Sequence, residues 1–129
     1  MAYVEALSGM DIDFGKSLWH ALRGSTKFPV EGALWLSRSE SDSWHFLIAT
    51  PRVDEIGRRK AYEELSRITR QLPVDSGQFS RIELISPEEP LYQALRSVFG
   101  KTASVEGARL GNTQIEGMYI NDAYLYEIR

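Results

Sequence analysis

The chain has 129 residues, of which 43% are hydrophobic and 26% are charged. This length and composition are typical of one globular domain that buries a core without metal ions or disulfides, and they exclude a disordered chain. The formal net charge is −3, so the chain lacks the overall basic character of most nucleic-acid-binding domains. We therefore expect a single domain covering residues 1–129.

The sequence contains no cysteine, which excludes disulfides, thiolate metal sites and a cysteine nucleophile. The N-terminal segment lacks the basic and apolar regions of a signal peptide, and no apolar run approaches the ~18 residues of a transmembrane helix. We therefore expect a soluble cytoplasmic protein that does not bind membranes. Phosphate-binding glycine motifs and the nucleophile-elbow motif do not occur, so no cofactor is predicted.

Amphipathic spacing predicts helices at residues 11–23 and 54–72. A third helix is predicted to begin within or shortly after residues 86–89 and to end at Gly100. Asp11 or Asp13 is the predicted N-cap of the first helix, because a short polar side chain there accepts a backbone hydrogen bond. Ser86 and the proline after it are typical of a helix start, although Pro90 favours a start a few residues later. The predicted inward-facing residues of this last helix are Leu91, Leu95 and Val98.

About six strands are predicted, at residues 32–38, 43–50, 79–85, 105–110, 113–120 and 123–128. A polar turn at 39–42 joins the first two, and two-residue turns at 111–112 and 121–122 separate the last three. The strand at 43–50 is apolar on both faces, which predicts a central position. The element order α-β-β-α-β-α-β-β-β favours an α+β fold with a mostly antiparallel sheet and helices packed on one side.

The sharpest candidate site comes from pairing the last three strands through these turns. The pairing places Glu116 directly opposite Glu127, and two carboxylates that close repel unless a proton or cation lies between them. Such a pair would bind a divalent metal or divide acid and base roles, helped by Arg109. In the structural alternative, Arg109 neutralises Glu116 diagonally, or a one-residue change of register moves Glu116 to the other face.

The histidines, His20 and His45, are candidates for acid–base catalysis because histidine titrates near neutral pH. His20 follows Trp19 in the first predicted helix, and His45 lies between two aromatic residues in the second predicted strand. Their spacing matches no metal-binding motif, so no metal site is predicted for them. The structural alternative is that each ring is a packed, hydrogen-bonded side chain.

A second surface for binding is the predicted helix 54–72. Its basic residues are Arg58, Arg59, Lys60, Arg67 and Arg70. Such a face would contact nucleic-acid phosphates, but Glu63 and Glu64 lie one helical turn from three of these cations and weaken the field. Arg58 falls on the apolar edge of the helix, where it would extend along apolar surface or reach a buried acid such as Glu83.

Trp35 and Trp44 lie on neighbouring predicted strands and are either core residues or, where exposed, binding anchors. The favoured hypothesis is a non-catalytic protein-interaction or accessory module whose partner is another protein or a second copy of the chain. One alternative is a small metal-assisted hydrolase that uses Glu116 and Glu127. The other alternative is a nucleic-acid binder that uses helix 54–72.

Overall fold

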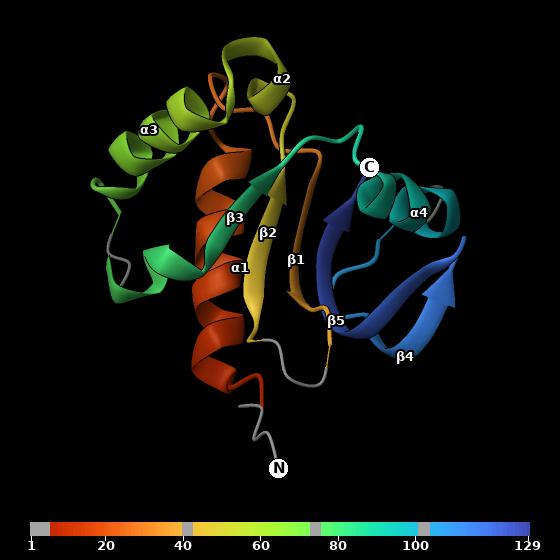
Figure 1. The fold of residues 1–129 in the computed structure, drawn as a ribbon. Coiled ribbons are helices and arrows are strands. Elements are labelled where there is room, and N and C mark those ends of the chain that lie inside the picture. Colours follow the sequence, from red (N-terminus) through yellow and green to blue (C-terminus); the bar gives the residue numbers. More distant parts are fainter. Residues whose placement is uncertain (1–5, 40–42, 73–75, 101–103) are drawn as a thin grey trace.

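The computed structural model describes residues 6–39, 43–72, 76–100 and 104–129. The helices in these ranges are α1 (Gly9–Arg23), α2 (Arg52–Ile56), α3 (Arg58–Thr69) and α4 (Pro90–Phe99), with a 3-10 helix η1 (Ser76–Arg81) (Figure 1). The strands are β1 (Gly32–Ser37), β2 (His45–Ala49), β3 (Ile82–Ile85), β4 (Arg109–Ile115) and β5 (Met118–Ile128). None of these helices is both long enough and apolar enough to cross a membrane.

The strands form one mixed sheet in the order β3-β2-β1-β5-β4. β1 pairs antiparallel with β2 and with β5, β4 and β5 form an antiparallel hairpin, and β2 and β3 pair in parallel. The predicted α+β class is confirmed, and β2 is a central strand as predicted. The described residues contain five strands rather than about six, and residues 40–42 of the predicted turn lie outside them.

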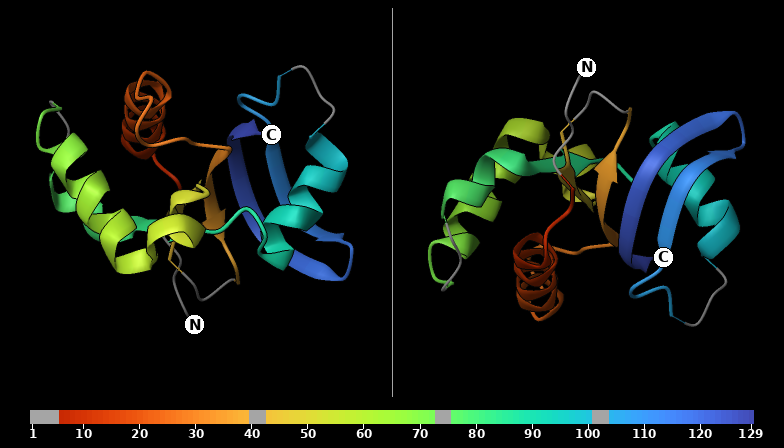
Figure 2. Two further views of the ribbon diagram at one scale, coloured as in Figure 1. Left: turned by 90° about the horizontal axis from the view of Figure 1, so that it is seen from above. Right: turned by 90° about the horizontal axis from the view of Figure 1, so that it is seen from below.

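Helices cover both faces of the sheet, whereas the sequence predicted helices on one side (Figure 2). On one face, α1 and α3 pack over Trp35 and Phe46; on the other, α4 packs over Leu34 and Leu47. Alternate residues of β1 and β2 thus enter separate hydrophobic clusters, because successive side chains of a strand point to opposite faces. A strand that is apolar on both faces requires cover on both faces, which is the physical reason for the correction.

The predicted helix 54–72 is two helices, because the chain breaks at Gly57. Gly57 has a φ of 87°, a conformation that glycine adopts without the steric cost of a Cβ atom. The break separates α2 from α3 and lets Asp54 on α2 accept a hydrogen bond from Ser86, 2.7 Å away. The strand predicted at 79–85 also begins late, since its first residues belong to η1.

The last quarter of the described chain contains two strands, not the three predicted. The hairpin turn falls at residues 116–117, whose φ angles of 48° and 80° are typical of a two-residue type I′ turn. The predicted turn residue Asn121 lies within β5 and donates to Ser37 on β1 over 3.1 Å. Its neighbour Asp122 accepts from Arg109 on β4 over 2.9 Å. These two polar residues therefore find partners on flanking strands and do not need to turn into solvent.

A β-bulge near the end of β5 directs two consecutive side chains toward α1. Ala33 on β1 lies opposite Glu127 and Leu34 lies opposite Leu125, so Tyr126 is the extra residue between them. Because one strand gains a residue at a bulge, the usual alternation of side chains is interrupted. Tyr126 joins the α1-side cluster, and Glu127 also reaches α1.

Both outer edges of the sheet are protected. At β3, the Tyr62 hydroxyl accepts from the Leu84 backbone N–H over 2.9 Å, and Arg58 donates to the Leu84 carbonyl over 2.8 Å. At β4, Asn112 has a φ of 48°, which interrupts the extended backbone, and its side chain accepts from the Tyr119 hydroxyl over 2.9 Å. Interrupted or covered edges discourage pairing with strands of other molecules.

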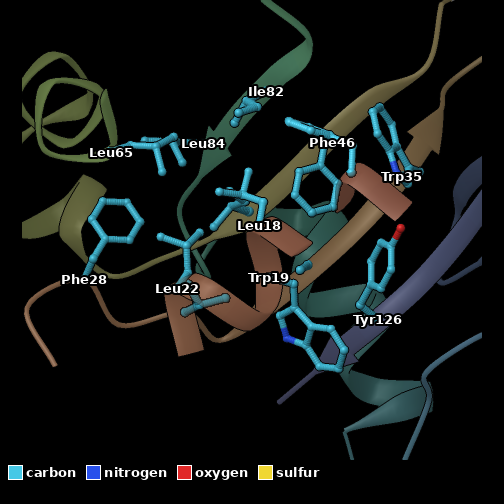
Figure 3. Packing of buried hydrophobic residues seen from close by; sticks show 14 of the residues in the cluster. Leu18, Trp19, Leu22, Phe28, Trp35, Phe46, Leu65, Ile82, Leu84 and Tyr126 are labelled. Carbon is cyan, nitrogen blue, oxygen red and sulfur yellow. The ribbon is translucent and has the colours of Figure 1, made fainter. Parts of the chain in front are cut away.

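The helix α1 approaches the sheet closely at Gly15 (Figure 3 shows the neighbouring cluster). Trp35 donates through Nε1 to the Asp11 carbonyl over 3.1 Å, and the Tyr126 hydroxyl donates to the Ile12 carbonyl over 2.7 Å. A Cβ atom on Gly15 would lie 2.5 Å from Tyr126 Oη and 2.7 Å from Trp35 Nε1. The absence of a side chain at this position therefore permits both hydrogen bonds.

The N-terminus of α1 is capped by Ser8, not by Asp11 or Asp13 as predicted. Ser8 Oγ accepts from the Asp11 N–H and Asp11 Oδ2 accepts from the Ser8 N–H, each over 3.1 Å, which is a capping box. Arg81 of η1 donates to Asp11 Oδ1 over 2.6 Å. Burial raises the pKa of Asp11, but the hydrogen bonds from Ser8 and Arg81 outweigh it, so the pKa lies below its usual value.

We expect Gly15→Ala to lower the free energy of unfolding by about 1–3 kcal/mol, because the added methyl group displaces two buried aromatic side chains. Gly9→Ala is the matched control on the same helix, since no atom lies within 4 Å of its added Cβ, and should change stability by less than about 0.5 kcal/mol. Urea denaturation of the three proteins measures both values. Equal effects of the two substitutions would contradict the close approach at Gly15.

We expect Asp11→Asn to cost about 1–3 kcal/mol near neutral pH, because the buried charge-assisted bond to Arg81 is lost. The folded-state pKa of Asp11 is lowered, so its stabilising effect is present above the unfolded-state value of about 3.9 and disappears as pH falls through the folded-state value. The stability gap between wild type and variant should therefore narrow below about pH 4. Urea denaturation between neutral and acidic pH measures the gap, with exposed Asp13→Asn as control; a gap independent of pH would contradict the prediction.

Candidate functional site

The structure does not bring Glu116 and Glu127 together. Glu116 lies in the turn that precedes β5, whereas Glu127 lies near the other end of that strand, opposite Ala33. The predicted pairing was wrong because the turns were placed at 111–112 and 121–122, and the actual turn is at 116–117. The carboxylate pair that would have bound a metal or divided acid and base roles is therefore not formed.

Arg109 does not contact Glu116 either. Its guanidinium forms a bidentate pair with Asp122, with both N–O distances at 2.9 Å, and lies 5.5 Å from the centre of the Trp44 ring. The hydrogen bonds from Arg109 to Asp122 raise the pKa of the guanidinium above its ordinary value. Arg109 thus joins β4 to β5 as a structural residue.

The histidines lie on different elements. His20 is exposed on α1 and its ring lies edge-on to Trp19, with ring centres 4.9 Å apart. His45 begins β2, is half-buried, and has its Nε2 atom 3.4 Å from Ser43 Oγ. Among the described residues, no group of three or more histidine, aspartate or glutamate side chains is arranged to hold a metal ion.

Trp35 and Trp44 are core residues rather than exposed binding anchors. Trp35 is fully buried and Trp44 is 4% exposed. The Trp35 indole uses its only N–H on the Asp11 carbonyl, and the Arg81 guanidinium lies 4.6 Å from its ring centre. The structure therefore supports the core alternative that the sequence left open.

The basic residues of the predicted helix 54–72 do not form one continuous face. Arg58 binds Glu89 over 3.1 Å as well as the Leu84 carbonyl, while the acid expected for it, Glu83, binds Arg38. Arg59 is exposed and pairs with Glu63 over 3.6 Å.

At the far end of α3, Arg67 borders a hollow of about 280 Å³ together with Lys27 and Glu64. Arg70 ends the helix as its C-cap residue. Glu64 is bound by Arg52, and the hydrogen bonds from Arg52 lower its pKa. An ionised carboxylate therefore lies within this hollow, which weakens its attraction for phosphate.

A hollow of about 430 Å³ among the described residues is termed the Trp19 pocket. It lies between the end of α1, the end of α4 and the end of β5, and its principal lining residues are Trp19, Arg23, Glu106, Tyr126, Glu127 and Arg129. Glu127 Oε1 accepts from Trp19 Nε1 over 2.9 Å, and Oε2 accepts from Arg129 Nε over 2.7 Å. The Arg23 guanidinium stacks on the Trp19 ring at 4.7 Å.

The composition of the Trp19 pocket was not predictable from sequence spacing. Glu127 was predicted to be a site residue, but as the partner of Glu116, which it does not contact. The residues that it does contact, Trp19 and Arg129, are brought to it by the bulge in β5 and by the packing of α1 on the sheet. A bulge of this kind leaves no clear local signal in the sequence.

A second, more apolar hollow of about 290 Å³ lies between the start of α4 and the β4–β5 hairpin, and is termed the Tyr119 groove. Its principal lining residues are Leu36, Glu89, Pro90, Leu91, Met118 and Tyr119. Tyr119 is 45% exposed, and its hydroxyl is bonded to Asn112. Glu89 at the rim is paired with Arg58. The groove therefore combines an apolar floor with an exposed tyrosine whose hydroxyl is fixed by a hydrogen bond.

Comparison with known proteins finds no matching family model, no matching curated protein and no matching solved structure. The two hollows are therefore the candidate functional sites of the described chain. Both lie along β5, whose first residues border the Tyr119 groove and whose last residues border the Trp19 pocket.

The two glutamates should respond oppositely to substitution. Glu116→Asn is expected to raise the free energy of unfolding by about 0.5–1 kcal/mol, because asparagine tolerates the positive φ of a type I′ turn better than glutamate. Glu127→Ala is expected to lower it by about 1–3 kcal/mol, because the buried Trp19 N–H loses its acceptor. Urea denaturation measures both, and a change of the same sign in the two variants would contradict this assignment.

Proposed function

We propose that this chain is a non-catalytic protein-interaction module whose partner places an apolar side chain in the Tyr119 groove. The observation that carries the proposal is an exposed tyrosine beside an apolar hollow, with its hydroxyl held by Asn112. Tyrosine is enriched at the energetic centres of protein interfaces. A side chain that is already ordered loses less conformational entropy on binding, so it contributes more to affinity.

The size and lining of the groove favour a side chain over a cofactor. Its volume of about 290 Å³ is at the lower limit of small-molecule sites, which run from about 300 to 1,000 Å³. The half-buried Leu91 and Met118 offer apolar contact, and the methionine adapts its shape to the occupant. The other large exposed hydrophobic residues of the described chain, Met10 and Val98, do not line this groove.

The expected occupant is a segment of a different protein that carries a large apolar side chain between neutral polar residues. The charged rim residues Arg38 and Glu89 are already paired with Glu83 and Arg58, so the rim offers both signs of charge and no strong net attraction. Protection of both sheet edges disfavours strand addition by a partner or by a second copy. Docking of side chains into a groove is the mode that remains.

Two observations weigh against the hydrolase alternative. Glu116 and Glu127 are separated, and Glu127 already accepts hydrogen bonds through both carboxylate oxygens. The ion pairs of Arg58 and Arg59 weigh against the nucleic-acid alternative, since affinity for nucleic acid depends mainly on available positive charge. A cytoplasmic location, which suits a chain without cysteine, is part of the proposal. The proposal includes no cofactor.

The test replaces Tyr119 with photoreactive benzoyl-phenylalanine in cells of the source organism, and compares it with the same replacement at Val98, an exposed apolar residue on α4 that does not line the groove. We expect position 119 to cross-link one distinct protein that position 98 does not. With that protein purified, Tyr119→Ala should weaken binding at least about tenfold in calorimetry, the usual loss at an interface anchor.

Thermal melting of Tyr119→Ala checks that the fold is retained, since this side chain is largely exposed. Equal cross-linking at both positions, or an unchanged affinity of the purified partner for Tyr119→Ala, would overturn the proposal. Cross-linking at position 119 only to a second copy of the chain would also overturn it, and would identify the groove as a homodimer contact.

A further inference from the structure

The Trp19 pocket has features of a ligand site that the proposed protein partner does not use. Its volume of about 430 Å³ lies within the range of small-molecule sites, and its lining residues differ from those of the Tyr119 groove. Its polar groups come from α1, from β5 and from the end of the described chain. An inference about this pocket is therefore independent of the proposed interaction.

Carboxylates in the Trp19 pocket are engaged within the protein. Glu127 accepts from Trp19 and from Arg129, and its side chain is 14% exposed. Glu106 pairs with Lys16 over 3.4 Å. A cationic ligand would have to displace these bonds, so the acidic residues of the pocket do not favour one.

Arg23 is an exposed basic residue at the same pocket that forms no ion pair among the described residues. Its guanidinium stacks on Trp19, and no carboxylate of the described residues forms an ion pair with it. Stacking leaves the N–H groups at the edge of the guanidinium plane available, and this planar fork matches a carboxylate or phosphate with two parallel hydrogen bonds. The indole beneath it is itself fixed by Glu127, so little orientational entropy remains to be lost.

We propose that the Trp19 pocket binds a small molecule through a carboxylate or phosphate group held by Arg23. Arg129 lies at the same pocket and contributes a second positive charge, of which only Nε is bound to Glu127. Trp19 and Tyr126, which pack against each other with ring centres 5.6 Å apart and are almost completely buried, form a fixed base behind the pocket. The ligand occupies the hollow in front of them while its oxyanion contacts the guanidinium.

The test follows the side-chain N–H signals of the three tryptophans in a ¹H–¹⁵N NMR spectrum of the full chain, assigned with Trp19→Phe. The protein is titrated separately with inorganic phosphate, acetate and benzoate. We expect the Trp19 signal to shift saturably, while those of Trp35 and Trp44, which do not line the pocket, stay unchanged. Saturation by phosphate alone indicates a phosphate ligand, and saturation by acetate or benzoate indicates a carboxylate.

Three substitutions make the assignment specific. Arg23→Gln should weaken the binding of the active probe at least about tenfold, because the bidentate contact is lost, whereas Arg70→Gln, the matched control on α3, should leave it unchanged. Glu127→Gln keeps an acceptor for Trp19 but removes a nearby negative charge, so it should strengthen binding by about threefold. Thermal melting confirms that each variant is folded.

The proposal is overturned if no probe shifts the Trp19 signal saturably at concentrations up to about 20 mM. A dissociation constant above that concentration would be weaker than the affinity expected from a bidentate contact. It is also overturned if Arg23→Gln and Arg70→Gln bind the probe equally. Because these measurements require no partner protein, their failure leaves the proposal for the Tyr119 groove unaffected.

Discussion

The attachment of the first turn of α1 to the sheet is the constraint on which the rest of the structure depends. Trp35 and Tyr126 each donate a hydrogen bond to a carbonyl in that turn, and Gly15 lets the helix approach closely enough for both. Large aromatic side chains bury much apolar surface, but their polar atoms must be satisfied when they do so. Once the helix is fixed at this end, Trp19 comes to lie on Tyr126 at the base of the Trp19 pocket. The same helix end binds Arg81, which joins η1 to the core.

The sequence predicted elements well where their patterns are local. The apolar residues on both faces of the segment 43–50 predicted a central strand, and the spacing of residues 11–23 predicted α1 within two residues of its start. The C-terminal turns were mispredicted because Asn121 and Asp122 remain within β5. They form hydrogen bonds there with Ser37 and Arg109, which lie on other strands and are distant in sequence. The actual turn has glutamate in a position with positive φ, where asparagine or glycine is the usual signal.

The candidate sites were less predictable than the fold, because each depended on a register or a helix face. A shifted turn separates Glu116 from Glu127, and a break at Gly57 directs Arg58 to the edge of β3 instead of to a continuous basic face. Glu127, Arg58 and Arg109, which appeared chemically active in sequence, thus form structural hydrogen bonds. The residues that line the two hollows appeared ordinary in sequence. Hollows form where elements that are distant in sequence pack together, and a local sequence pattern does not predict that packing.

β5 connects these observations. Hydrogen-bonded to β1 on one side and to β4 on the other, it borders the Tyr119 groove at its start and the Trp19 pocket at its end. The two hollows therefore lie at opposite ends of one strand, the groove beside the part of β5 that pairs with β4 and the pocket beside the part that pairs with β1. The lining of the hollows differs: one is mainly apolar with paired charges at its rim, and the other holds a stacked guanidinium beside engaged carboxylates. Different surfaces at the two ends of one strand suit two different ligands, and this is the physical reason for assigning a protein segment to the groove and a small anion to the pocket.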